Sequence, residues 1–488
     1  MPGICGGYCF TGTLGFRFSI AGDESLMAGL VSFSIIALAA LALLALAAPI
    51  IRRYPPIGIG LIFLVLITVW DIPNPPPVIS LSGLTAYPAD VIAVVLLVVA
   101  ILEVSQLREN LRGWLVPWVF FGVLIAVSLL RGVADFGLAT AVNSARTDLH
   151  FFCVMTWVFA VGPDRLKLRA ASLVLGWVLV LVAAYHGVTH GFGGVMSATA
   201  IAGADFLQTG RVLYAGQAAA LLLCAGTVLL SPSDSARVRP QFAAVSSAVF
   251  LGVVVIAQHR SVWSAGALGM ILVLIWSGRR LARTRVLTSL IIGAWLGLFL
   301  WSTGIIGHSD SGLFESVFDT RTYDWRTGSW QALISEAIAK GPEVVVGGEP
   351  FGTRYLRQVG SDRWTDLSAH NWYVTTFLGL GILGLIMLAG MLIAALVKSR
   401  SNSAATTFVI AAVAAYGWAY SLDWYLTPWL GAAMVASLGG LGRADHAVSD
   451  TSNNGPINAV SVAGGGGINT VKSRTSMVAI RPREGVGL

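Results

Sequence analysis

The sequence predicts an all-α polytopic membrane protein with about thirteen membrane-spanning helices, within a range of roughly 12 to 14. Of its 488 residues, 56% are hydrophobic and only 11% are charged, whereas an ordinary soluble domain is roughly 25% charged. The apolar residues form runs of about 20 rather than an alternating pattern. Because lipid cannot hydrogen-bond a bare backbone, such runs must cross the membrane as helices.

Thirteen apolar segments carry this prediction, and several of them are short. We place the spans at residues 26–50, 55–70, 88–104, 114–130, 149–162, 170–189, 211–230, 242–258, 262–277, 286–306, 371–397, 405–422 and 424–441.

The orientation follows from the basic residues, which concentrate in cytoplasmic loops. Sixteen Lys and Arg residues fall in alternate connections, which must then share one side. The short segments on the other side hold only Arg17, Arg131, Arg146, Arg211 and Arg260. We therefore expect a multi-pass protein of the cytoplasmic membrane, with its N-terminus outside and its C-terminus in the cytoplasm.

Five regions result from this topology. Residues 1–25 form an extracytoplasmic N-terminal segment, 26–306 hold the first ten spans, 307–370 form a large extracytoplasmic loop, 371–441 hold the last three spans, and 442–488 are a disordered cytoplasmic tail rich in Gly, Ser and Asn. Within the loop, apolar residues at helical spacing from Trp330 to Ile338, followed by Gly341-Pro342, predict an amphipathic helix that lies on the membrane surface.

Charge and cysteines exclude several classes of function. The formal charge of +7 is explained by topology, so we expect membrane lipids and no nucleic acid among the partners. The four cysteines lack a CxxC pair, which argues against a zinc site. His186 and His190 have metal-ligand spacing without a third ligand, and no DxD pair occurs, so we expect neither a metal nor another cofactor.

Four basic residues recur where outer helix ends meet the bilayer: Arg211, Arg260, Arg326 and His370. A guanidinium offers a rigid, permanently charged fork to phosphate, so two of them can neutralise a diphosphate without a metal. A histidine, which titrates near neutrality, suits a general base acting on a sugar hydroxyl. The structural alternatives are an interfacial snorkelling arginine for Arg260 and a helix cap or a hydrogen-bonded structural residue for His370.

Short motifs around these residues resemble a known family. Gly210-Arg211, the run from Gln258 to Trp263, Arg326 to Trp330 with Gly347 to Gly352, and His370-Asn371-Trp372-Tyr373 followed by Gly379, Gly381 and Gly384 look like the O-antigen ligase and O-antigen polymerase superfamily. The order of the motifs and the place of the loop also match. Gln258-His259 stands where that family usually has small hydroxyl residues.

The resemblance implies a metal-independent, type C glycosyltransferase-like protein. Such enzymes take a glycan from a polyprenyl diphosphate donor and pass it to a hydroxyl of a glycan, lipid or protein acceptor. It further implies that Arg211 and Arg260 bind the diphosphate and that His370 activates the acceptor. Either Arg326 or Arg321 corresponds to the family's loop arginine, which would add to the donor diphosphate site.

Other polar residues at the outer helix ends are candidates for the acceptor or the cavity wall. Asn371 and Tyr373 follow His370 directly, and Arg146 and His150 lie four residues apart, on one helix face. A satisfied interfacial cluster is an equal reading of the latter pair.

The alternative function is a polytopic transporter or flippase of a lipid-linked glycan. Such proteins usually show repeated halves and charges near the membrane midplane, and neither pattern occurs in this sequence. The residues leave open whether an enzyme of this kind would be a ligase, a polymerase or a protein oligosaccharyltransferase.

Overall fold

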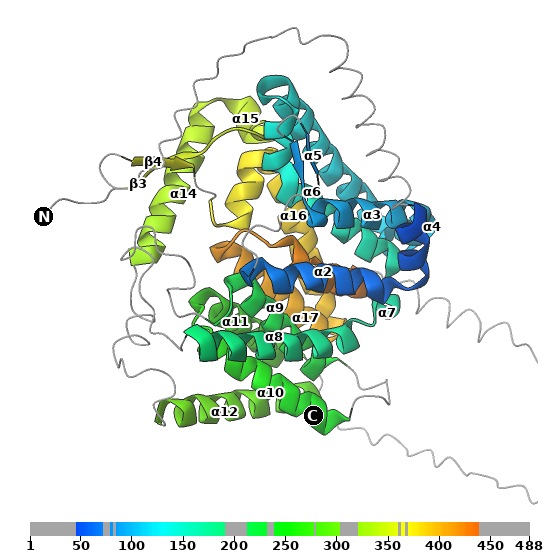
Figure 1. Ribbon diagram of the computed structural model, residues 1–488, viewed down its shortest axis with the longest axis vertical. Coiled ribbons are helices and arrows are strands. Elements are labelled where there is room, and N and C mark those ends of the chain that lie inside the picture. The colour runs from blue at the N-terminus through cyan, green and yellow to red at the C-terminus, as the bar shows by residue number, and fades with distance from the viewer. Residues whose placement is uncertain are drawn as a thin grey trace, which may run out of the picture. The chain divides into compact units, whose positions relative to one another are not determined.

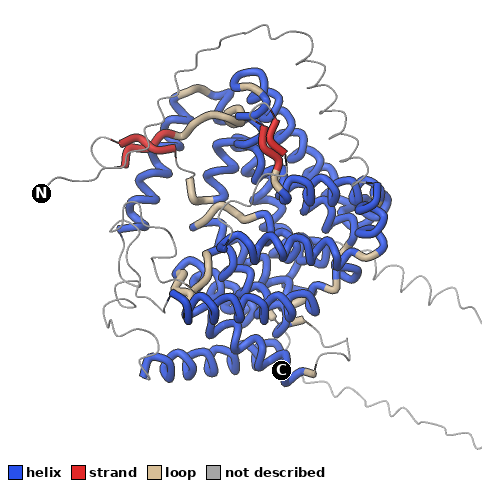
Figure 2. Tube along the Cα trace, in the orientation of Figure 1, coloured by secondary structure: helices blue, strands red, loops and turns tan. Residues whose placement is uncertain are grey.

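The computed structural model describes residues 45–71, 79–81, 84–190, 212–231, 239–277, 280–302, 321–359, 363–366 and 369–438. All of these lie in the first of two units, Met1–Gly440, and the predicted tail falls in the second, Leu441–Leu488, outside the described residues. The described part is almost entirely helical, with two short hairpins (Figures 1 and 2). The all-α prediction is therefore confirmed for this part of the chain.

Three described helical stretches are long and apolar enough to cross a membrane: Val104–Phe136, Pro163–Thr189 and Trp372–Arg400. A fourth is obtained if Ala45–Arg53 and Pro55–Thr68, which meet at a bend of 111°, form one broken span. Further apolar helices of 10–17 residues accompany them. The chain is thus a membrane protein, and the thirteen spans and their orientation stay predictions.

The helices of the first half are α2 (Pro55–Asp71), α3 (Pro88–Leu102), α4 (Val104–Leu111), η1 (Arg112–Trp114), α5 (Leu115–Phe136), α6 (Leu138–Val161), α7 (Pro163–Leu166) and α8 (Leu168–His190). Those of the second half are α9 (Ala215–Leu230), α10 (Pro240–Ile256), α11 (Arg260–Trp276), α12 (Arg280–Ser302), α14 (Arg321–Ala339), α15 (Pro342–Gly347), α16 (Trp372–Asn402), α17 (Ala404–Ala419), η3 (Trp424–Leu426) and α18 (Thr427–Leu438). Two antiparallel hairpins pair β1 (Ile79–Leu81) with β2 (Leu84–Ala86) and β3 (Leu356–Val359) with β4 (Arg363–Asp366).

Helix α9 is the centre of the core, because each of its residues is buried. Its small residues admit neighbours closely, as is usual between membrane helices. A Cβ on Gly226 would collide with the ring of Phe408 from α17, and a Cβ on Gly266 of α11 would meet Leu222. Figure 1 shows α9, α11 and α17 together.

The directions of these three helices follow from their contacts. His259 Nε2 donates to the Leu213 carbonyl at 2.9 Å, and Gly266 packs on Leu222, so α9 and α11 are parallel. Helix α17 runs the opposite way, because its residue Phe408 contacts Gly226 whereas Asp423, just beyond its end, contacts Gly216. The first residues of α9 and α11 and the last residues of α17 therefore lie at one end of the bundle. We call it the site end.

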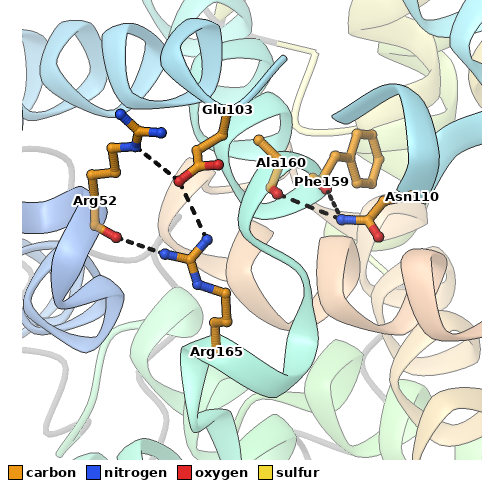
Figure 3. A network of polar contacts seen from close by, with 6 residues as sticks. All are labelled: Arg52, Glu103, Asn110, Phe159, Ala160 and Arg165. Carbon is orange, nitrogen blue, oxygen red and sulfur yellow. Dashed lines mark hydrogen bonds and ion pairs between the residues drawn. The ribbon is translucent and has the colours of Figure 1, made fainter. Parts of the chain in front are cut away.

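Helix α6 begins at Leu138, ahead of the predicted start at residue 149. Its polar first half is stabilised by α3, whose Asp90 pairs with Arg146 and His150. At the other end of α3, Glu103 pairs with Arg52 and Arg165, and Asn110 donates to the Phe159 carbonyl (Figure 3). Helices α3 and α6 are therefore parallel and tied at both ends.

The predicted loop helix is confirmed as α14, which ends just before Gly341. Its buried residues Trp330, Leu333 and Ala337 pack against Val374 and Leu378 of α16. Most of the apolar stripe that was expected to face the membrane surface is thus covered by protein instead, whereas Ile338 at its end is exposed. The reason is that α16 presents a matching apolar turn at the same place.

Glycines clamp the end of the loop between α5 and α16. Gly381, with φ of +66°, interrupts α16 and approaches Val346 and Gly348 so closely that a Cβ would lie 2.2 Å from the Val346 carbonyl oxygen. From α5, Arg131 donates to the Gly348 carbonyl at 3.0 Å and Ser128 to the Glu349 carbonyl. The glycine pattern in this stretch therefore has a packing role.

Candidate functional site

Arg260 is the first residue of α11 and lies at the site end, half-buried. A cation at a helix N-terminus opposes the helix dipole at a cost of about 0.3–1 kcal/mol, whereas an anion there is favoured by both the dipole and the free N–H groups. The position thus suits a guanidinium whose role is to hold an anionic ligand.

Arg211 and the side chain of Arg321 lie outside the described residues. The residues that follow Arg211 are nevertheless located. The Val212 carbonyl accepts from His186 Nδ1 at 3.0 Å, and the Leu213 carbonyl accepts from His259. His186, which has metal-ligand spacing in the sequence, thus has a structural partner. His259, the residue before Arg260, is hydrogen-bonded to Leu213, which is two residues after Arg211 in the chain.

His370 stands between two anchored residues. The Ala369 carbonyl accepts from Trp330 Nε1 at 2.6 Å, and Asn371 is the N-cap of α16, with its side-chain oxygen accepting from the Val374 N–H. The cap is therefore Asn371, and the alternative reading of His370 as a cap is wrong. His370 itself has φ of +48° and is half-buried.

Unusual backbone conformations occur just before α11 and just before α16. Only four described non-glycine residues have positive φ, and these include Gln258 and His370. Gln258, with φ of +57°, is in the turn before α11, and its Oε1 is buried without a hydrogen bond from the described residues. Such conformations cost of order 1–3 kcal/mol and cluster at functional sites.

Asn371 and Tyr373, the candidates for acceptor contact, bond to the backbone of α17. Asn371 Nδ2 donates to the Trp418 carbonyl at 2.8 Å, and Tyr373 Oη donates to the Ala414 carbonyl at 2.7 Å. Asn371 is 1% exposed. These bonds hold the start of α16, and with it His370, against the C-terminal half of α17.

Arg326 reaches the site end from the loop. Its Nη1 donates to the Ala419 carbonyl at 3.0 Å, and its guanidinium lies 5.0 Å from the centre of the Tyr420 ring. This position at the last residue of α17 suits a cation, because carbonyl groups there lack helical partners. The Nε of Arg326 is buried and has no hydrogen bond from the described part of the chain.

Asp423 is a site residue that sequence reasoning missed. It lies just after α17, where Tyr416 Oη donates to it at 3.3 Å, and burial raises its pKa to about 6. Tyr425 and the N-terminal residues of α9 surround it. A lone acidic residue between two predicted spans gave no motif, because the phenols that surround it are brought together only by folding.

Arg146 and His150 also lie near the site end. His150 Nε2 is 2.7 Å and Arg146 Nε is 2.9 Å from Asp90 Oδ1. The His150 ring is 5.2 Å from the ring of Trp424, and the ring of its neighbour Phe151 is 5.4 Å from that of Trp372, both in edge-to-face geometry. Two separate contacts thus join this part of α6 to the residues around His370.

Neither a known family model nor a curated protein matches the chain. The chemistry of the site therefore has to be argued from its own residues. The described part of the site end includes Arg260, Arg326, His370 and the half-buried Asp423, from α11, α14, the segment before α16 and the segment after α17. Permanent cations beside a titratable imidazole can bind an anionic leaving group and deprotonate a hydroxyl in one place.

Proposed function

We propose that the protein transfers a glycan from a polyprenyl diphosphate donor to a hydroxyl acceptor at the outer face of the cytoplasmic membrane. The observation that carries this proposal is the convergence, at one end of the α9, α11 and α17 bundle, of Arg260, Arg326 and His370 from distant parts of the sequence. The resemblance of the surrounding motifs to the O-antigen ligase and polymerase superfamily supports it independently.

The proposed reaction is a single displacement. Arg260 and Arg211 hold the donor diphosphate, and Arg326 adds positive charge from the loop. His370 accepts the proton of the acceptor hydroxyl while its oxygen attacks the anomeric carbon. The bond from that carbon to the phosphate oxygen breaks with inversion, and the polyprenyl diphosphate leaves with both electrons of the bond.

The two contributions differ in size. Stabilisation of the leaving diphosphate by pre-positioned guanidinium groups is the larger, because charge develops there in the transition state. General base assistance by His370 contributes about 10²–10⁴-fold. No step requires a bound metal, because the arginines neutralise the diphosphate.

Arg260→Ala tests the proposal. Lipid-linked glycan and acceptor are extracted from a strain that lacks the protein and are incubated with purified protein in vesicles. The wild type should produce transferred glycan, whereas the variant should produce none, although it still inserts. Arg239→Ala is the matched control, because Arg239 is an exposed arginine at the start of α10 and should be dispensable. Wild-type turnover by Arg260→Ala would refute the scheme.

The same assay separates an enzyme from a transporter. A flippase would change only the leaflet in which the lipid-linked glycan is found, without forming a new glycosidic bond. Mass spectrometry of the strain that lacks the protein then assigns the acceptor class. Accumulated single repeats on lipid indicate a polymerase, and accumulated long chains indicate a ligase.

A further inference from the structure

Asp90, Arg146 and His150 form a polar cluster that the proposed reaction does not use. Placing ionisable side chains within a helical membrane bundle is costly, and they usually mark a ligand pathway. The side chains of Arg146 and Asp90 are 22% and 24% exposed, whereas that of His150 is 6% exposed. The cluster is therefore built on a buried imidazole, and both its arginine and its carboxylate are partly exposed.

The guanidinium of Arg146 is held on three sides. Its Nε donates to Asp90, its Nη2 donates to the Thr85 carbonyl, and its face lies 4.8 Å from the centre of the Tyr87 ring. Asp90 is held in turn by the Tyr87 N–H at 2.7 Å. The remaining nitrogen, Nη1, makes no hydrogen bond within the described part of the chain. It is a rigidly placed donor.

Charge decides which substrate suits this donor. The cation of Arg146 is paired with the carboxylate of Asp90, which weakens its attraction for a diphosphate. A fixed donor beside the ring of Tyr87 suits a sugar, which offers hydroxyl oxygens and apolar ring faces.

We propose that Arg146, positioned by Asp90 and His150, binds the acceptor glycan through Nη1. This inference rests on the proposed function and names the acceptor side of the same site. The contact between Phe151 and Trp372 puts this part of α6 next to the segment that starts with His370. In this proposal Arg146 presents the acceptor sugar to the base from α6, and the donor diphosphate is bound by Arg260 from another helix.

The chain contains a matched control at the other end of α3. There Arg52 and Arg165 share one oxygen of Glu103 at 3.0 and 3.4 Å (Figure 3). Arg165 Nη2 also donates to the Arg52 carbonyl at 2.7 Å. This second cluster ties the same helix with the same chemistry, but it lies away from His370, so its substitution should affect stability alone.

The test is a kinetic comparison of Arg146→Lys with Arg165→Lys in detergent. The polyprenyl-diphosphate-linked glycan fraction of a strain that lacks the protein serves as donor. Its envelope glycoconjugates, treated with mild acid to destroy glycosyl diphosphates, serve as acceptor. Arg146→Lys should raise the KM for the acceptor fraction roughly tenfold or more, since one charged hydrogen bond is lost. The KM for the donor should be unchanged, and Arg165→Lys should leave both unchanged.

A second variant, Tyr87→Leu, retains the ion pair and removes the ring under the guanidinium, and it should raise the same KM by a smaller factor. The inference is overturned if the acceptor KM of Arg146→Lys is unchanged while its kcat falls or its donor KM rises. It is also overturned if Arg165→Lys raises the acceptor KM as much as Arg146→Lys does. Absence of any transfer by the wild type overturns the proposed function itself, and the inference with it.

Discussion

At the residue scale, His370 and Asn371 show how two neighbours in the chain differ in role. Asn371 is 1% exposed and has its oxygen and nitrogen bonded to the Val374 N–H and the Trp418 carbonyl. His370 is half-buried, with a left-handed backbone. The sequence allowed a cap role for His370 and an acceptor contact for Asn371, whereas the structure shows that Asn371 is the cap.

This difference leads to a paired prediction. His370→Gln should slow transfer by about 10²–10⁴-fold, since the base is lost. Asn371→Ala should lower the free energy of unfolding by about 0.5–2 kcal/mol through loss of the cap. Thermal unfolding in detergent and the transfer assay measure the two effects. An unstable His370→Gln variant with normal turnover would reverse the assignment.

The arginines near the site end differ in their electrostatic surroundings, although they are the same residue type. Arg260 is at a helix start, where an anionic ligand is favoured, whereas Arg326 donates to the last carbonyl of α17 and stacks on Tyr420. Arg146 is neutralised by Asp90. The residue type is the same in each case, but the partner decides which ligand each can bind.

At the element scale, the interruption of α16 at Gly381 holds the loop. The segment that follows α15 packs against the break in α16. There the Glu349 N–H donates to the Leu378 carbonyl at 2.7 Å. Lys340 at the end of α14 reaches Glu349 at 3.1 Å and Glu336 at 2.9 Å. These ion pairs raise the pKa of Lys340, which keeps it charged.

Gly381→Ala should therefore destabilise the protein and impair transfer. A residue with a Cβ in the backbone conformation of Gly381, which essentially only glycine adopts, costs of order 1–3 kcal/mol, and the collision with the Val346 carbonyl adds to this cost. Gly390→Ala is the control in the same helix, because a Cβ there would meet nothing within 4 Å, and it should shift stability by no more than about 1 kcal/mol. Equal melting temperatures for the two variants would contradict the clamp.

Element boundaries were predicted well where apolar runs end at polar residues, as for α9, α10 and α11. Helix α6 extends ahead of the span predicted from residue 149, and Arg146 and His150 lie near that predicted boundary. Their shared partner Asp90 lies on another helix and satisfies them. A pairing of this kind has no signal in a linear pattern.

At the scale of the whole molecule, the orientation in the membrane can be measured directly. In a chain with its four cysteines replaced by serine, Ser335→Cys on the exposed side of α14 should react with an impermeant maleimide on intact cells. Arg283→Cys at the exposed start of α12 should react only after permeabilisation. The opposite pattern would place the site end in the cytoplasm and remove the basis for the proposed reaction.

The sequence by itself determined the helical membrane class, the positions of most helices and the residues worth testing, because these depend on apolar runs and local spacing. Tertiary structure alone decided that Arg260, Arg326 and His370 share one end of the bundle, that Asp423 lies among tyrosines, and that the stripe of α14 faces α16. The physical reason is that helix direction and cross-helix hydrogen bonds join residues far apart in the chain, and no periodicity encodes those partners.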